Sequence, residues 1–236
     1  MAKTTEAMTM AHPYDAKYFE GLNRPGFWGN NSFREAQRMH TLEALCQPRK
    51  DDELLELGCG TGRYTRVLAD RVRRIVGVDF SAAAIEKALS ESTRPNMELR
   101  KADIRDLRIF LDRSFDKIVA IDVLEHLSDD DLRAVLAEVK RLMREEALFV
   151  FFTPSGSHWI ERLKQKGILR QVTGHIRVRT EREYGDILHR QGFRIRDVIR
   201  YETCIPLWRL IEGKMKDMPF TGGGVFVSRL GMSVSH

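Results

Sequence analysis

Short apolar runs alternate with amphipathic stretches along most of the chain. The apolar runs are rich in Val, Ile and Leu, which is typical of buried strands. Parallel strands need long crossovers, so strands separated by helices predict a parallel sheet covered on both faces. The predicted strands are 53–57, 74–78, 97–101, 115–121 and 147–153.

The stretches between these strands have helical periodicity and recognisable starts. One helix is predicted over 33–45, and another carries Tyr64, Val67 and Leu68. Ser81 has the position of an N-cap, and Ser128 with Asp131 resembles a capping box. The helix after Ser128 has an apolar stripe at positions 132, 135, 136, 139, 142 and 143.

The C-terminal part of the chain has a different pattern. A helix over 181–191 ends at Gly192, and 194–201 is a predicted strand. A last strand over 224–230 is expected to pair antiparallel at the sheet edge. The whole is predicted as a lid or entry segment over 1–32 and one α/β domain over 33–236, with a helix-and-loop insertion at 155–180.

Composition narrows the class of protein without naming a function. The chain has 236 residues, 42% hydrophobic and 31% charged, as expected of one globular domain. No apolar run approaches the roughly 20 residues that span a bilayer, and residues 1–13 lack the pattern of a signal peptide. Three widely spaced cysteines argue against a disulfide framework or zinc site and favour a cytoplasmic location.

Basic residues are concentrated in the insertion and at the start of the helix after it. Such a run is usually a solvated face, with contact to an anion or a nucleic acid as the alternative. The formal net charge of +5 is a modest excess. The residues are Arg162, Lys164, Lys166, Arg170, Arg177, Arg179 and Arg182.

A glycine-rich segment comes directly after the first predicted strand. Residues 56–62 read Glu-Leu-Gly-Cys-Gly-Thr-Gly, and glycines there allow a sharp turn and close approach of a ligand to the backbone. A dinucleotide fingerprint requires glycine at position 63, which is Arg63. A phosphate-binding P-loop is excluded because the segment has no Gly-Lys-Ser/Thr after it.

Two carboxylates come after the next two strands. Asp79 lies 21 positions after Gly58 (79 − 58), the interval expected for a residue that binds both ribose hydroxyls of an adenosine. Asp103 comes after the third strand, where it can accept a hydrogen bond from an adenine amine while Ile104 packs on the ring. Each residue alone has a structural explanation, as a helix cap or a loop acid, but together they favour an adenosyl site.

Residues 56–62, 76–81, 102–104 and 121–127 resemble motifs one to four of the class I S-adenosylmethionine-dependent methyltransferases. The resemblance covers about 51–154 and implies a Rossmann-like, doubly wound, seven-stranded and mostly parallel sheet with an antiparallel edge strand. It implies S-adenosylmethionine as cofactor, with Glu56, Gly58, Cys59, Gly60 and Gly62 around its methionine part. It further implies that Asp79 binds the ribose, Phe80 and Ile104 enclose the adenine, Asp103 binds its amine and Asp122 borders the sulfonium.

The residues after the fourth strand are candidates for chemistry on the methyl acceptor. His126 has an imidazole whose pKa lies near neutrality, so it is a candidate general base, with packing against the cofactor as the alternative. The pattern Asp122-x-x-Glu125-His126 also resembles that of metal-assisted O-methyltransferases, which have a further histidine downstream. By that resemblance Asp122, Glu125, His126 and His175 would hold a divalent cation, a cofactor that we do not expect as the first choice.

Methylation of a small molecule, with an oxygen as the acceptor atom, is the first functional hypothesis. The second is RNA 2′-O-methylation with metal assistance, suggested by the basic stretch. A non-catalytic nucleotide-binding protein is the alternative outside the enzymes. No membrane partner is expected, and the sequence does not fix the acceptor or the oligomeric state.

Overall fold

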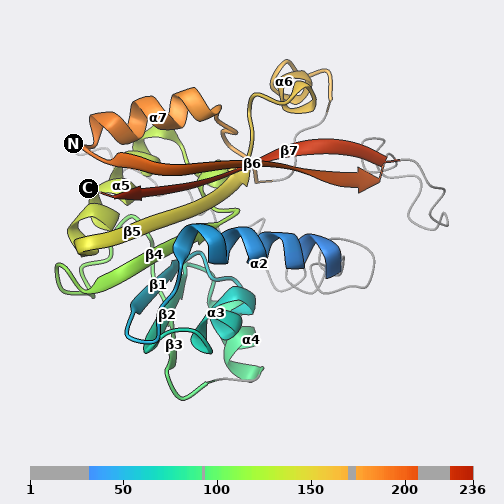
Figure 1. Ribbon diagram of the computed structural model, residues 1–236. Coiled ribbons are helices and arrows are strands. Elements are labelled where there is room, and N and C mark those ends of the chain that lie inside the picture. The colour runs from blue at the N-terminus through green and yellow to red at the C-terminus, as the bar shows by residue number, and fades with distance from the viewer. Residues whose placement is uncertain (1–31, 92–93, 170–173, 207–223, 236) are drawn as a thin grey trace, which may run out of the picture.

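A single seven-stranded sheet organises the computed structural model, which describes residues 32–91, 94–169, 174–206 and 224–235 (Figure 1). The strand order is β3-β2-β1-β4-β5-β7-β6. Strands β1 to β5 pair in parallel, whereas β7 is antiparallel to both of its neighbours. The fold class predicted from the sequence is therefore confirmed. The predicted lid over 1–32 lies, apart from Ser32, outside the described residues.

The elements succeed one another as the hydrophobic pattern predicts. The strands are β1 (Glu53–Leu57), β2 (Arg74–Asp79), β3 (Met97–Lys101), β4 (Phe115–Ile121), β5 (Met143–Pro154), β6 (Arg194–Pro206) and β7 (Gly224–Ser235). The helices are α2 (Ser32–Cys46), α3 (Arg63–Ala69), α4 (Ala82–Ser90), η1 (Leu124–His126), α5 (Asp129–Leu142), α6 (Trp159–Gln165) and α7 (Glu181–Arg190).

Local capping signals are borne out by hydrogen bonds. The Ser81 side chain accepts from the Ala84 backbone N–H, and the Ser128 side chain accepts from that of Asp131. Three acidic residues in the first turn of α5 and two basic residues in its last turn also complement the helix dipole. These short-range interactions fix where α4 and α5 begin.

Strand β5 begins earlier than the apolar pattern predicts. It starts at Met143 directly after α5, and its pairing with β4 jumps from Phe115–Met143 to Lys117–Leu148. The residues between these pairs are mostly polar, so the start of the strand does not appear as an apolar run in the sequence. Among them Arg144 forms an ion pair with Asp116.

Strand β7 lies one place in from the sheet edge, between β5 and β6, and not at the edge itself. Leu230, Met232 and Val234 are fully buried in the core layer on one of its faces, and its backbone pairs with β5 on one side and with β6 on the other. Strand β6 is the edge strand, and it carries exposed charged residues together with the partly exposed Ile195 and Val198. Charges on an edge strand discourage pairing with other chains.

Two apolar layers hold the helices on the two faces of the sheet. On one face α5 and α7 cover the sheet, with Leu136 and Leu188 among the buried residues. On the other face α2 and α3 cover it, with Leu45 and Leu68 among the buried residues. None of the described helices has the length and apolar character needed to cross a membrane. Cys46 and Cys59 are buried free thiols.

Candidate active site

The carboxyl ends of β1 and β4 flank the point where the strand order reverses. In open α/β sheets this topological switch point is where ligands bind. Gly58 lies there with a φ of 66°, and a Cβ on it would come within 2.5 Å of Val123 Cγ2. Only glycine therefore satisfies both the backbone conformation and the close contact with the segment after β4.

The end of β2 holds a carboxylate against the glycine loop. Asp79 Oδ2 accepts from the Gly60 backbone N–H at 2.9 Å, and its Oδ1 accepts from the Ser81 N–H at 2.9 Å. Burial, partly offset by these two hydrogen bonds, raises the pKa of Asp79. Each oxygen has a second lone pair, so the carboxylate can also accept from the hydroxyls of a ligand.

The glycine loop is further fixed by its own residues. The Cys59 N–H donates to the Val78 carbonyl at 2.9 Å, so the loop is tied to β2. Gly62, with a φ of 74°, is the N-cap of α3. Cys59 also packs against Gly77, where an added Cβ would come within 3.0 Å of its sulfur.

Glu56, at the start of this motif, is a buried acid. Its Oε2 accepts a short hydrogen bond from the Thr65 hydroxyl. Burial is the main cause that raises the pKa of Glu56 to about 8; the hydrogen bond from Thr65 opposes this shift, and the nearby Asp79 carboxylate adds to it. The unliganded protein therefore holds a proton on Glu56 at neutral pH.

The pKa of Glu56 predicts a pH dependence of stability. Between the unfolded value near 4.5 and the folded value of about 8, the folded chain binds one more proton than the unfolded chain. The free energy of unfolding should then fall by up to about 1.4 kcal/mol per pH unit across this window. Urea denaturation of the unliganded protein and Glu56→Gln at several pH values measures it. Identical pH slopes for the two proteins would contradict the assignment.

The predicted adenine ligands lie on the same edge of the sheet, at β2 and β3. The aromatic Phe80 is directly after Asp79 and is 40% exposed, whereas Ile104 is half-buried against the core. Asp103 accepts from the backbone and side chain of Arg105, which also contacts Asp131. The Arg105 guanidinium holds the pKa of Asp103 below its usual value.

Asp122, directly after β4, points toward helix α2. Its backbone has a φ of 54°, which is unusual for a residue other than glycine. Its carboxylate forms an ion pair with Arg38 at 2.6 Å, and Arg38 also donates to the Tyr64 hydroxyl at 3.3 Å. The described part of the N-terminal region is thereby joined to the proposed sulfonium side of the site.

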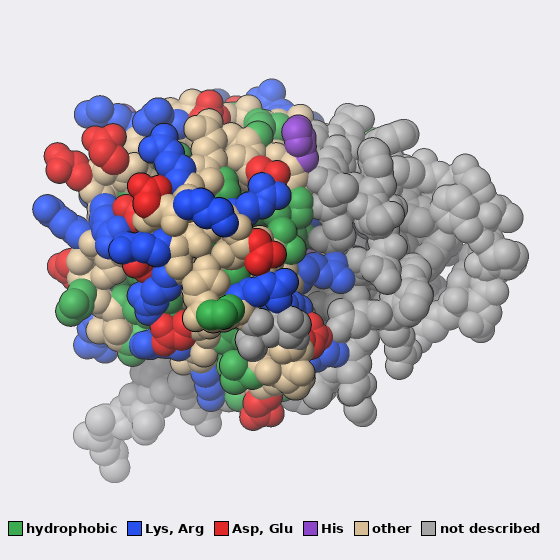
Figure 2. All heavy atoms as spheres, turned by 60° about the horizontal axis from the view of Figure 1, so that its bottom comes forward, with side chains coloured by type: hydrophobic (Ala, Val, Ile, Leu, Met, Phe, Trp, Pro, Cys, Tyr) green, Lys and Arg blue, Asp and Glu red, His purple; other side chains and the backbone are tan. Residues whose placement is uncertain are grey.

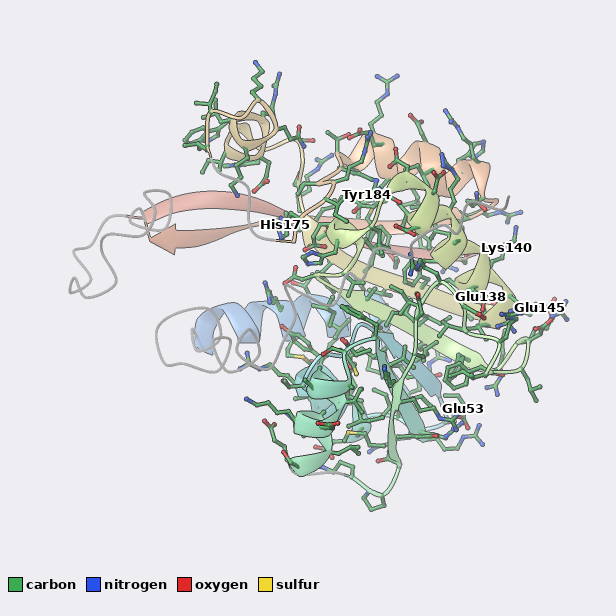
Figure 3. All side chains as sticks on the ribbon, turned by 180° about the vertical axis from the view of Figure 1, so that it is seen from behind. Glu53, Glu138, Lys140, Glu145, His175 and Tyr184 are labelled. Atoms are coloured by element: carbon green, nitrogen blue, oxygen red, sulfur yellow. The ribbon has the colours of Figure 1, made fainter. Side chains whose placement is uncertain are left out.

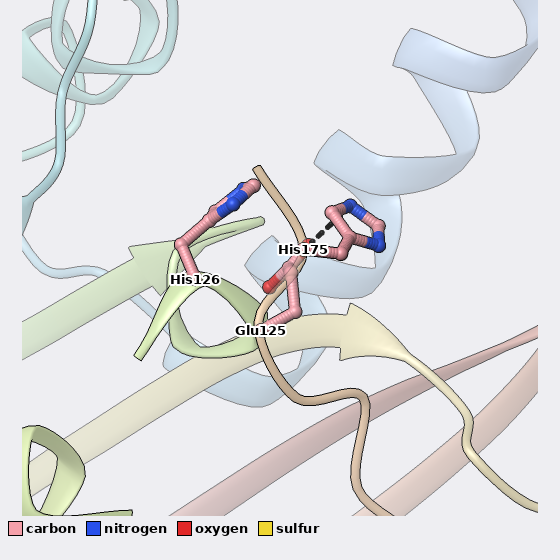
Figure 4. A group of neighbouring side chains, drawn as sticks. All are labelled: Glu125, His126 and His175. Carbon is pink, nitrogen blue, oxygen red and sulfur yellow. Dashed lines mark ion pairs between the residues drawn. The ribbon is translucent and has the colours of Figure 1, made fainter. Parts of the chain in front are cut away.

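Three of the four predicted metal ligands come together after β4. Glu125, His126 and His175 have potential ligand atoms within 4.8 Å of one another (Figure 4). His175 Nε2 lies 3.9 Å from Glu125 Oε1, and the two imidazole rings pack edge to face with centroids 5.0 Å apart. Asp122 is not a member of this group.

Backbone hydrogen bonds join the two segments that carry these side chains. His126 Nδ1 donates to the Gly174 carbonyl at 2.7 Å, which leaves the ring lone pair on Nε2. The N–H groups of Ile176 and Arg177 both donate to the Glu125 carbonyl. Burial lowers the pKa of His126, so its imidazole is held neutral.

The buried side of the cluster is supported by a hydroxyl chain. The Thr153 hydroxyl donates to Glu125 Oε2 at 3.2 Å, and the Tyr184 hydroxyl donates to Thr153 at 3.4 Å. Glu125 and His126 follow the carboxyl end of β4, and Thr153 lies at the carboxyl end of β5. Figure 3 shows His175 far from Glu53, which marks the amino end of β1, so the cluster lies at the same edge of the sheet as the glycine loop.

Two residues of this site have no signal in the sequence. Arg38 lies in an ordinary helical pattern, and Arg179 lies in the basic stretch that predicts a solvated face. Arg179 is instead completely buried and binds the turn after β4. Lys164 is also largely buried and is paired with Glu161. The basic stretch therefore does not form one solvated face.

A Rossmann-like sheet with a glycine loop and a buried acid at neighbouring strand ends is typical of nucleoside-binding α/β proteins. The chain matches the family described as "Methyltransferase domain" over residues 30–198. It belongs to this family, whose class I members use S-adenosylmethionine as cofactor.

Individual relatives and solved structures agree with this assignment. A "probable S-adenosylmethionine-dependent methyltransferase" of Mycolicibacterium smegmatis is 31% identical over 136 residues, which cover 57% of this chain and 48% of the relative. The chain thus spans about half the length of that relative. The YcgJ protein of Bacillus subtilis has a TM-score of 0.66 at 17% identity, covering 84% of this chain and 97% of that one. A structure described as "DhpI-SAM-HEP complex" has a TM-score of 0.60 at 19% identity, covering 94% and 92%.

The residues present fit S-adenosylmethionine. Three glycines with positive φ form the loop, and a side chain on Gly58 would fill the space beside Val123. Asp79 offers a buried carboxylate with free acceptor capacity for ribose hydroxyls. The exposed ring of Phe80 is suited to packing against a flat base.

Proposed function

We propose that this chain methylates an oxygen atom of a small-molecule acceptor. When bound, S-adenosylmethionine supplies a methyl group on a sulfonium that is already activated for displacement. The chain's own contribution is to bind the two reactants in line and to accept the acceptor's proton.

His126 is the proposed general base. The observation that carries this role is its 2.7 Å hydrogen bond from Nδ1 to Gly174, because it selects the tautomer with a basic Nε2. Burial keeps the ring neutral, as a base must be before it accepts a proton. Nε2 would take the proton of the acceptor hydroxyl as its oxygen is methylated, so that the oxygen is left as a neutral ether and the proton is held on His126.

Asp79, Glu56 and the glycine loop are proposed to bind the cofactor, with Asp103, Phe80 and Ile104 around its adenine. Asp79 would accept from the ribose hydroxyls, and the backbone of the loop would contact the methionine part. Asp122 would face the sulfonium while paired with Arg38. These assignments rest on the positions of the residues at neighbouring strand ends and on the family motifs.

A small-molecule acceptor is favoured over RNA by the distribution of basic residues. Within the basic stretch Arg179 is buried and Lys164 is paired, so fewer cations are available to phosphates. On the face in Figure 2, the Lys and Arg side chains of the described residues are interspersed with Asp and Glu side chains. The cytoplasmic location inferred from cysteine usage stays a prediction.

A screen of methyl acceptors tests the proposal. Phenols, sugars, carboxylates, amines and short RNA would each be incubated with labelled S-adenosylmethionine. We expect transfer to hydroxyl compounds that is lost in His126→Ala. Transfer only to RNA, or only to amines or carboxylates, would contradict the proposed acceptor class.

A divalent metal at Glu125, His126 and His175 is a second candidate for activating the acceptor. The cluster fits this role because His126 donates its other ring N–H to a carbonyl, as metal-bound histidines do. Such a metal would act as a Lewis acid on the acceptor hydroxyl.

Removal of metals separates the two candidates. If His126 acts as the base, treatment with EDTA and then desalting should leave the rate of methyl transfer within about twofold of the untreated rate. If a metal is required, the rate should fall at least about tenfold and return with added Mg²⁺ or Mn²⁺. Glu125→Gln is a second check on the metal alternative, since it removes a charged ligand while it keeps the side-chain shape.

A further inference from the structure

Arg179 is the most deeply buried cation of the described residues. Its side chain is 0% exposed, and isolated charges are costly to bury unless their hydrogen bonds are satisfied. Its Nη2 donates to the Leu127 carbonyl at 2.9 Å and to Asp129 Oδ1 at 2.7 Å. Its Nη1 donates to the carbonyls of Leu124 at 3.1 Å and Arg177 at 3.3 Å.

These contacts surround the turn that carries Glu125 and His126. The carbonyls of Leu124 and Leu127 lie immediately before and after that pair, so one guanidinium holds both ends of the turn. The backbone of Arg179 is held in turn by the Gly156 N–H, which donates to its carbonyl at 2.9 Å. A Cβ on Gly156 would come within 2.7 Å of the Arg179 carbonyl carbon, so the two backbones are packed without spare room.

The same residue belongs to the segment that carries His175. Residues 174–177 already bind the turn through His126 Nδ1 and the Glu125 carbonyl. Arg179 adds a third connection between segments about 50 residues apart in the sequence. The relative position of the two imidazole rings therefore depends on how well this guanidinium fits.

We propose that Arg179 is a positioning residue that holds His126 and His175 in the arrangement needed for methyl transfer. The inference rests on the proposed function for its effect on the reaction, but its structural part is independent of the reaction. Lysine is a poor substitute because an ammonium lacks the planar fork that reaches several carbonyls and a carboxylate together.

Arg179→Lys tests this role, with Arg182→Lys as the control. Arg182 belongs to the same basic stretch but is exposed. Histidine ring signals would be recorded by NMR on ¹⁵N-histidine-labelled protein, and affinity for S-adenosylhomocysteine by calorimetry. Arg179→Lys should shift the ring signals of His126 and His175 and abolish the protected Nδ1–H signal of His126. Its affinity for S-adenosylhomocysteine should stay within about twofold, because the glycine loop and Asp79 are untouched.

Turnover provides the second readout. A misplacement of about 1 Å costs up to about 100-fold in rate, so Arg179→Lys should lose about 10- to 100-fold while Arg182→Lys loses none. In a His126→Ala background the same change should cost little more, since the group it positions is gone.

Unaltered histidine signals in a folded Arg179→Lys protein would overturn the proposal. If this variant does not fold, Asp129→Asn is compared with wild type in the same way, because Asp129 is 38% exposed and water can compensate its loss. Failure of the wild-type protein to methylate any acceptor would instead refute the proposed function and leave the histidine result valid.

Discussion

Replacing His126 by alanine is expected to lower methyl transfer by about 10²- to 10⁴-fold, the range contributed by a positioned general base. Affinity for S-adenosylhomocysteine should change little, because the Gly60–Asp79–Ser81 hydrogen bonds lie at other strand ends. Methyl transfer should slow because, without Nε2, the proposed acceptor for the hydroxyl proton is lost.

Single-turnover rates and calorimetry on the same preparation measure the two quantities. His189→Ala is a suitable control, because His189 is exposed on α7. Equal losses of rate and cofactor affinity would show that His126 packs against the cofactor and does not act as a base. An unchanged rate would remove His126 from the mechanism altogether.

Replacing Asp79 by alanine is expected to weaken binding of S-adenosylhomocysteine by about 1–3 kcal/mol, or about 5- to 150-fold. The change removes the charged acceptor for the ribose hydroxyls. It also leaves the N–H groups of Gly60 and Ser81 without their acceptor, so the free energy of unfolding should fall as well.

Calorimetry at a temperature well below the unfolding midpoint separates binding from stability. Asp79→Asn should give an intermediate loss, since the amide keeps one acceptor oxygen. Asp70→Ala is the matched control, because Asp70 is an exposed acid at the end of α3. A folded Asp79→Ala protein that binds S-adenosylhomocysteine as tightly as wild type would exclude Asp79 from the cofactor site.

The parts of the fold that the sequence predicts well are those set by local interactions. The bounds of β1, β3 and β4 match the apolar runs, and Ser81 and Ser128 cap the helices that their positions predict. The glycine motif and Asp79 are likewise brought together by the parallel sheet alone. Once strands 53–57 and 74–78 pair side by side, their carboxyl ends must meet.

The features of the fold and site that the sequence does not predict depend on contacts between segments far apart in the chain. The place of β7 inside the sheet is set by its pairing with β5 and β6. The ion pair of Asp122 with Arg38 requires α2 to cross beside the end of β4. Arg179 is indistinguishable in sequence from its exposed basic neighbours, because its burial results from carbonyls about 50 residues away.

We propose above all that the carboxyl ends of β1 and β2 bind an adenosyl cofactor of the methyltransferase type. Titration of the wild-type protein with S-adenosylhomocysteine and, separately, with NAD tests this binding. We predict saturable binding of one S-adenosylhomocysteine per chain and far weaker binding of NAD. Preference for NAD, or binding of neither, would contradict the claim.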